Sequence, residues 1–287
     1  MKAAYATTGK IFEQVSMRTQ PGMYKQLKEV APSDIVVVQG QYDHIEKLLD
    51  TLKVPYALIS PEEITSHNGG RVMFVNCATY APAPKREAVI KAFVEQGGRL
   101  VTTDWAVGLV ERTFPGKLEK KGKTTDDVVE INCNTDLSRT FIGMNYAQCH
   151  PKWWLESSSD LYTVGKGVLP VITSDEMQER YGQDTVVAGF AAGRGEVFHF
   201  ISHLELQRTK NKTKEDGKGL ETFLEKIGAQ KTIDMEDATV AELESAYSTL
   251  NTLAHLCVAT PLINTDMKSV SMKTAKIATG MTSKKLV

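Results

Sequence analysis

The sequence predicts a doubly wound α/β fold built on a mainly parallel β-sheet. Two observations support this fold class. Several short runs of consecutive apolar residues, such as the one within Asp34–Gln41, are typical of strands buried on both faces. Between them lie stretches with apolar residues at helical spacing, as at Ile45, Leu48, Leu49 and Leu52. Strands that alternate with helices in this way form parallel sheets covered on both sides.

Residues 34–114 contain the clearest part of this pattern, and a helix over residues 10–31 is expected to pack on that core. Glycine and proline mark the ends of the elements, as at Gly97-Gly98 and Pro82. The predicted strands are Asp34–Gln41, Val54–Ser60, Arg71–Cys77 and Arg99–Ala106, and the predicted helices cover residues 42–54, 86–98 and 106–114.

The next segment, to residue 206, is less regular. Asp126–Asn134 alternates like an exposed or edge strand, and Trp153-Trp154 is expected to be core in a region of loop and short strands. Val168–Ser174 and Asp184–Gly193 are predicted strands. Residues 193–205 indicate a hairpin that turns at Gly193-Arg194-Gly195.

The composition shifts after Gln207. Residues 207–266 predict a helical extension, with helices over 218–228 and 235–257. The last 21 residues carry five Lys and no acid, which predicts a mobile basic tail. The expected organisation is therefore an α/β domain over 1–206, a helical extension over 207–266 and a tail over 267–287.

Charge and composition narrow the possible functions. The chain of 287 residues has 34 Lys+Arg against 35 Asp+Glu, so no nucleic-acid partner is expected. No apolar run reaches the roughly 18 residues that a membrane span needs, and the N-terminus has no signal-like core. The four cysteines form no CxxC pair, so we expect reduced thiols, a cytoplasmic protein and no metal site. Phosphate-loop and dinucleotide-binding motifs are absent, and no cofactor is predicted.

Ligands of open parallel sheets lie outside the carboxyl ends of the strands. This rule predicts one crevice, to which the last strand contributes if it runs parallel to the others. The crevice residues are Gln39, Gly40, Asn76, Cys77, Thr103, Asp104 and Trp105, with Ser202, His203 and Glu205 from the last strand.

Over residues 34–206 the chain resembles the class I glutamine amidotransferase-like superfamily, which implies a flavodoxin-like sheet. In that family a turn after the fourth strand carries a nucleophilic Cys, and a later His-x-Glu supplies the base and its orienting acid. The segment Ser202–Glu205 corresponds to the His-x-Glu, and the turn TTDWA corresponds to the nucleophile turn. Asp104 or Trp105 stands there in place of Cys. The segment PKWWLESSSDLYTV is also similar to uncharacterised bacterial members lacking the Cys.

The resemblance without the Cys predicts a pseudoenzyme, a non-catalytic domain that binds a small ligand or a protein. One alternative is a Cys-dependent hydrolase or amidotransferase-like enzyme that uses Cys77, His203 and Glu205, because Cys77 ends a strand facing the same crevice. Another is a structural or assembly component that acts through its surface and C-terminal extension, with a homo-oligomer as one form. Whether the protein is an enzyme stays open at this point, and a role without catalysis is favoured.

Overall fold

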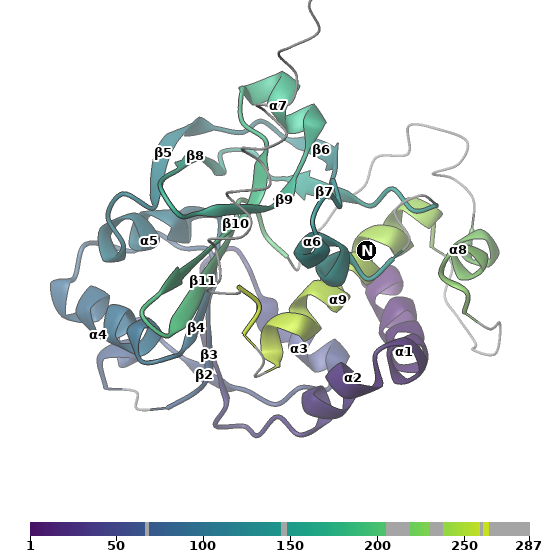
Figure 1. The fold of residues 1–287 in the computed structure, drawn as a ribbon, viewed down its shortest axis with the longest axis horizontal. Coiled ribbons are helices and arrows are strands. Elements are labelled where there is room, and N and C mark those ends of the chain that lie inside the picture. The colour runs from purple at the N-terminus through teal and green to yellow at the C-terminus, as the bar shows by residue number, and fades with distance from the viewer. Residues whose placement is uncertain (67–68, 145–147, 205–218, 230–237, 259–260, 264–287) are drawn as a thin grey trace, which may run out of the picture.

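A computed structural model describes residues 1–66, 69–144, 148–204, 219–229, 238–258 and 261–263. Its centre is a seven-stranded sheet with the order β2-β1-β3-β4-β11-β10-β9 (Figure 1). The five strands from β2 to β11 are parallel, and β10 is antiparallel to both of its neighbours, β11 and β9. The prediction of a mainly parallel α/β sheet is confirmed. The strands are β1 Ile35–Val38, β2 Ala57–Ile59, β3 Val72–Val75, β4 Arg99–Thr103, β9 Leu169–Thr173, β10 Thr185–Ala192 and β11 Gly195–Phe200.

Every residue of β1, β3, β4 and β11 is buried. This explains why β1 and β3 are continuous apolar runs in the sequence, since helices cover both of their faces. The predicted hairpin is also confirmed, because β10 pairs antiparallel with β11 across Gly193. The pairing of Phe200 with Thr103 shows that β11 runs parallel to β4. The carboxyl ends of β1, β3, β4 and β11 therefore meet at one edge of the sheet.

Helices α4 and α5 lie on one side of the sheet, and α3, α9 and α1 lie on the other (Figure 1). A single N-terminal helix over residues 10–31 was a wrong prediction. The chain forms two helices that meet at Gln20, since Pro21 cannot continue α1 and instead begins α2. The helices are α1 Lys2–Thr19, α2 Pro21–Lys28, α3 Ile45–Leu52, α4 Pro84–Glu95, α5 Val107–Thr113, α6 Asp136–Ile142, α7 Asp175–Tyr181, α8 Leu220–Ile227 and α9 Val240–Cys257, with 3-10 turns η1 Glu63–Thr65 and η2 Asp104–Ala106.

Helix α9 is buried along nearly its whole length and belongs to the main hydrophobic core. It packs against α1 and α6, and a capping box formed by Thr239 and Glu242 begins it. Its buried Asn251 donates hydrogen bonds to the carbonyls of Thr140 and Phe141. The C-terminal helical segment thus covers the sheet. The tail over 267–287 lies outside the described residues, and the boundary at 206 stays a prediction.

Two antiparallel ribbons lie beside the main sheet; their pairing was not predicted, although β6 (Asp127–Glu130) falls within the predicted strand Asp126–Asn134. Strand β5 (Leu118–Lys123) pairs with β8 (Asp160–Val164), and β6 pairs with β7 (Lys152–Leu155). The β5 sequence is almost wholly charged and exposed, so it carries no apolar strand signal. Trp153 and Trp154 are buried in the short strand β7, as expected. No helix in the described part of the chain is both long and apolar enough to cross a membrane.

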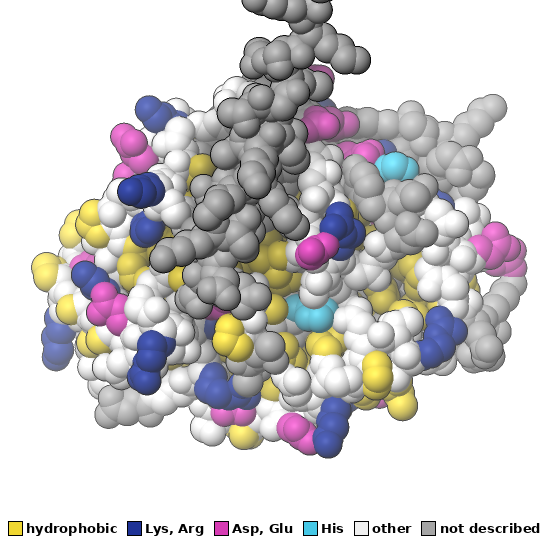
Figure 2. All heavy atoms as spheres, viewed as in Figure 1, with side chains coloured by type: hydrophobic (Ala, Val, Ile, Leu, Met, Phe, Trp, Pro, Cys, Tyr) yellow, Lys and Arg dark blue, Asp and Glu magenta, His cyan; other side chains and the backbone are white. Residues whose placement is uncertain are grey.

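The surface carries charges of both signs. On the face shown in Figure 2, Lys and Arg side chains alternate with Asp and Glu side chains, and apolar side chains are exposed between them. Among the described residues, neither sign forms a continuous patch on this face.

Candidate functional site

The turn after β4 holds a strained acidic residue. The chain leaves β4 at Thr103, passes through η2 and enters α5. Asp104 adopts the left-handed conformation, with φ +45°, and is only 3% exposed. A non-glycine residue held in this region costs of order 1–3 kcal/mol, and such strain concentrates at functional sites. The turn therefore aims the Asp104 carboxylate inward at the carboxyl edge of the sheet.

Cys77 follows β3 and faces this carboxylate. Its Sγ donates to Asp104 Oδ2 at 3.3 Å, and its side chain is fully buried. The Cys77 carbonyl accepts hydrogen bonds from the backbone N–H groups of Gln41 and Tyr42. A Cβ on Gly40 would lie 2.5 Å from the Asn76 Cβ, so only glycine permits this approach of the β1 loop. The loops after β1 and β3 thus hold Cys77 at the carboxyl edge of the sheet, where it is buried.

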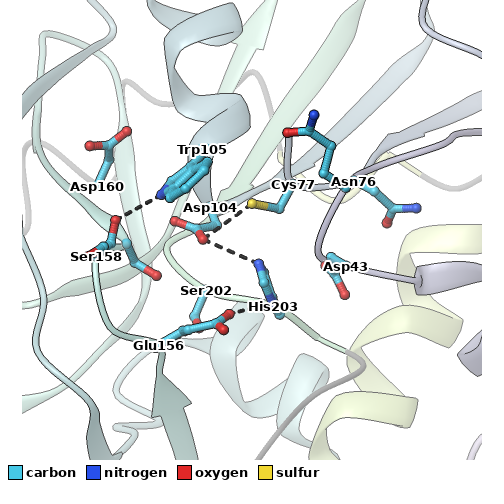
Figure 3. A network of polar contacts seen from close by, with 12 residues as sticks. Asp43, Asn76, Cys77, Asp104, Trp105, Glu156, Ser158, Asp160, Ser202 and His203 are labelled. Carbon is cyan, nitrogen blue, oxygen red and sulfur yellow. Dashed lines mark hydrogen bonds and ion pairs between the residues drawn. The ribbon is translucent and has the colours of Figure 1, made fainter. Parts of the chain in front are cut away.

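His203 lies three residues beyond β11 and completes the cluster (Figure 3). Its Nε2 is 3.3 Å from Asp104 Oδ2, and its Nδ1 is 2.5 Å from Glu156 Oε2. Donor atoms of Cys77, Asp104 and His203 all lie within 4.8 Å of one another. The ring is thus held between two carboxylates, with the Cys77 thiol beside it.

The surroundings of the cluster raise the pKa values of both His203 and Cys77. Burial opposes the charged form of His203, but hydrogen bonds to Asp104, Cys77 and Glu156 and the nearby Asp43 charge outweigh it, raising the pKa to about 12. Burial raises the pKa of the Cys77 thiol to about 11, although hydrogen bonding to His203 opposes this shift. At neutral pH the cluster therefore holds an imidazolium and a neutral thiol.

Two acids of the site were missed in the sequence. Glu156 follows β7 and lies against His203, where the resemblance implies Glu205; Glu205 itself lies outside the described residues. The backbone N–H of Glu156 donates to Ser202 Oγ at 3.2 Å. Asp43 is fully buried and accepts from the Leu204 N–H. Both positions could have been found in the sequence. Glu156 is an acidic residue directly after the apolar run of β7, and Asp43 is an acidic residue shortly after β1.

The remaining predicted crevice residues have different surroundings. Asn76 is buried and supports α3, because its Oδ1 accepts from the Ile45 N–H at 3.1 Å. Gln39 is exposed, whereas Thr103 is fully buried. Trp105 is partly exposed and donates from Nε1 to the Ser158 carbonyl at 2.8 Å (Figure 3). Of the predicted residues, the structure thus brings together Cys77, Asp104 and His203. Ser202 is linked to this cluster indirectly, by its hydrogen bond with the backbone of Glu156.

A cavity of about 330 Å³ lies between α1, α2 and α3, away from this cluster. Another, of about 300 Å³, lies beside Trp105. Three cations line the second cavity together with one acid: Lys120 and Lys123 both pair with Asp160, and Arg112 pairs with Glu87 outside the lining. The Lys123 Nζ also lies 5.3 Å from the centre of the Trp105 ring. The lining residues are Thr79, Tyr80, Trp105, Gly108, Arg112, Lys120, Lys123 and Asp160.

No protein-family model matches the sequence, and no curated protein matches it. Similar solved structures include a glutamine amidotransferase from Thermotoga maritima (9% identity, 61% of this chain, 77% of that chain, TM-score 0.43). A putative GMP synthase subunit from Thermoplasma acidophilum is 10% identical, and the match covers 86% of this chain and 98% of that chain with a TM-score of 0.45. A β-galactosidase from Rahnella sp. R3 is 11% identical, and the match covers 63% of this chain and 29% of that chain with a TM-score of 0.46. The chain spans less than a third of the β-galactosidases it matches. The fold class rests on the sheet order itself.

Proposed function

We propose that this chain is a binding domain without amidotransferase catalysis, which takes a small anionic ligand in the cavity beside Trp105. The observation that carries the proposal is the Asp104 carboxylate at the turn after β4. It accepts a hydrogen bond from the Cys77 thiol at 3.3 Å. A nucleophilic cysteine must become a thiolate, and an adjacent carboxylate disfavours that second negative charge. Full burial of Cys77 also closes it to a bulky substrate.

The cavity supports an anionic ligand through its charge. Arg112, Lys120 and Lys123 contribute three positive charges to the lining. Asp160 in the lining and Glu87, which pairs with Arg112 from outside it, contribute two negative charges, so one positive charge remains in excess. Its volume of about 300 Å³ is at the lower end of small-molecule sites, which run from about 300 to 1,000 Å³. The Trp105 and Tyr80 rings offer apolar contacts beside these charges. A small carboxylate or phosphate ester fits this combination of size and charge.

The binding proposal is tested with citrate, inorganic phosphate and adenosine monophosphate as probes. At least one probe is expected to raise the thermal midpoint and quench Trp105 fluorescence, and added salt should weaken the effect because the contacts are ionic. The double variant Lys120→Gln/Lys123→Gln should lose the effect. Lys91→Gln, on an exposed face of α4, is the matched control. Equal responses in the two variants, or no response to any probe, would overturn the proposed ligand site.

The enzyme alternative now takes the form Cys77, His203 and Glu156. It is favoured by the 2.5 Å contact that orients the His203 ring. Burial raises the pKa of Cys77, but hydrogen bonds from His203 and from the backbone N–H of Trp105 oppose that rise. Iodoacetamide competition among the four thiols separates the two functions. A binding domain predicts that Cys77 reacts as slowly as an ordinary buried thiol, because burial raises the pKa of Cys77 to about 11 and that of Cys133 to about 12. Preferential alkylation of Cys77 that disappears in His203→Gln would support the enzyme.

An assembly role through the surface and residues 207–266 stays a prediction, as does a homo-oligomer. Sedimentation of the full chain tests the homo-oligomer, and a variant ending at residue 266 tests whether residues 267–287 carry the assembly. An oligomer of the full chain that becomes a monomer in the shorter variant would favour assembly through the tail, and a monomeric full chain would contradict the homo-oligomer.

A further inference from the structure

The cluster at the carboxyl edge contains three chemically different donors. Cys77 offers sulfur, Asp104 oxygen and His203 nitrogen, and the three side chains are 0%, 3% and 1% exposed. They come from the ends of three adjacent strands, β3, β4 and β11 (Figure 3). Sulfur, imidazole nitrogen and carboxylate oxygen are together the donor types that Zn²⁺ prefers in proteins.

The distances fit a tetrahedral ion. Ligands placed about 2.0–2.3 Å from a tetrahedral Zn²⁺ lie about 3.3–3.8 Å from one another. Asp104 Oδ2 is 3.3 Å from both Cys77 Sγ and His203 Nε2. The third side of this triangle, from Cys77 Sγ to His203, is no longer than 4.8 Å. Small side-chain rotations would therefore bring all three donors around one ion.

The surroundings match those of protein metal ligands. A metal-bound histidine commonly holds a carboxylate on its other ring nitrogen, which fixes the orientation of the ring. Glu156 Oε2 has that position, 2.5 Å from His203 Nδ1. The second carboxylate oxygen of Asp104, Oδ1, is buried and has no hydrogen-bond partner among the described residues. Within the same part of the chain, His203 is the only cation paired with Asp104 or Glu156.

The geometry points to a divalent transition-metal site, of the kind that takes Zn²⁺, formed by Cys77 Sγ, Asp104 Oδ2 and His203 Nε2. Binding releases the Cys77 thiol proton and the His203 Nε2 proton, so the net charge of the cluster is unchanged. Glu156 is a positioning residue that holds the ring. The ion joins the loops after three strands, and it is compatible with the binding function above, because the anionic ligand is held by other residues.

The first test uses the full chain with Zn²⁺ alone and Co²⁺ alone. We expect one ion per chain, a higher thermal midpoint, and the sulfur-to-cobalt charge-transfer absorption of a tetrahedral thiolate site. X-ray absorption of the zinc-loaded wild-type protein should show one sulfur at about 2.3 Å together with nitrogen and oxygen ligands. A shell with no sulfur overturns the site. This readout needs no variant, so a folding failure cannot obscure it.

Variants then assign the donors. Cys77→Ser should remove the charge-transfer absorption, and His203→Gln and Asp104→Asn should each weaken Co²⁺ binding. Glu156→Gln should weaken it about 10–100-fold with the sulfur absorption retained. Cys133→Ser and His150→Gln are the matched controls, a buried thiol and a surface histidine paired with Glu130. Binding that survives Cys77→Ser unchanged, or that is lost in His150→Gln, would overturn the assignment.

Discussion

The guanidinium of Arg99 and the carboxylate of Glu196 form a buried ion pair between β4 and β11, with Nη2 2.5 Å from Oε1. Both side chains also hold backbone groups beyond the sheet. Arg99 Nη1 donates to the carbonyls of Leu256 and Val258, and Glu196 accepts from the N–H of Ile263. The pair therefore fastens the end of α9 to the centre of the sheet.

Breaking this pair on one side should be strongly destabilising. Arg99→Met leaves the Glu196 carboxylate buried without its cation, which should lower the free energy of unfolding by about 3–5 kcal/mol in urea titrations. Adding Glu196→Leu should restore part of that loss, since no unpaired charge then remains. Arg139→Met, which breaks the exposed pair with Asp136, should cost less than about 1 kcal/mol. Equal costs for Arg99→Met and Arg139→Met would contradict the anchoring role.

The left-handed conformation of Asp104 predicts an unusual order of stabilities. Asp104→Gly and Asp104→Ala both remove the carboxylate, but only glycine adopts φ +45° without strain. The glycine variant should therefore be more stable than the alanine variant by about 1 kcal/mol in urea unfolding. Ala106 has φ −65° in the same turn, so Ala106→Gly should instead be destabilising. If Asp104→Ala were the more stable variant, the backbone at residue 104 would not be strained.

Gly40 should tolerate no side chain. An alanine Cβ there would lie 2.5 Å from the Asn76 Cβ and 2.7 Å from the Cys77 carbonyl oxygen. Gly40→Ala should lower the free energy of unfolding by about 1–3 kcal/mol and increase alkylation of Cys77, because its loop must move. Gly22 is exposed in α2 with open space around it, so Gly22→Ala should stabilise by about 0.5–1 kcal/mol. A Gly40→Ala protein with wild-type stability would contradict the close packing.

His255 should make the fold sensitive to acid. Burial lowers its pKa to about 4, and the charge of Arg99 acts in the same direction. The unfolded chain, with a histidine pKa near 6.5, binds this proton more readily, so the stabilisation is complete above about pH 6.5 and is lost as the pH falls toward 4. The expected loss is about 3 kcal/mol.

His255→Gln should flatten that pH dependence in urea unfolding measured between pH 7 and pH 4.5, while a glutamine amide can still donate to Gln20 Oε1. A slope that is the same in wild type and His255→Gln would show that His255 does not titrate as expected.

Much of the sheet and three site residues could be predicted from the sequence. The sequences of β1 and β3, and Leu100-Val101 within β4, are apolar because both faces of those strands are covered, and burial of this kind can be recognised locally in the sequence. The carboxyl ends of these strands then predicted Cys77 and Asp104. His203 required one further assumption, that β11 runs parallel to β4, and the sheet confirms it.

Only the tertiary structure decided what surrounds these residues. Glu156 contacts His203 from the loop after β7, and the charge of Asp43 acts on it from the loop after β1. No local sequence pattern specifies an interaction between segments so far apart in the chain. The φ of Asp104 is likewise imposed by the packing of the turn, since an aspartate by itself prefers negative φ. Sequence periodicity records which faces are buried. The position of one loop against another depends on side-chain packing across the whole sheet, and that decides the chemistry of the site.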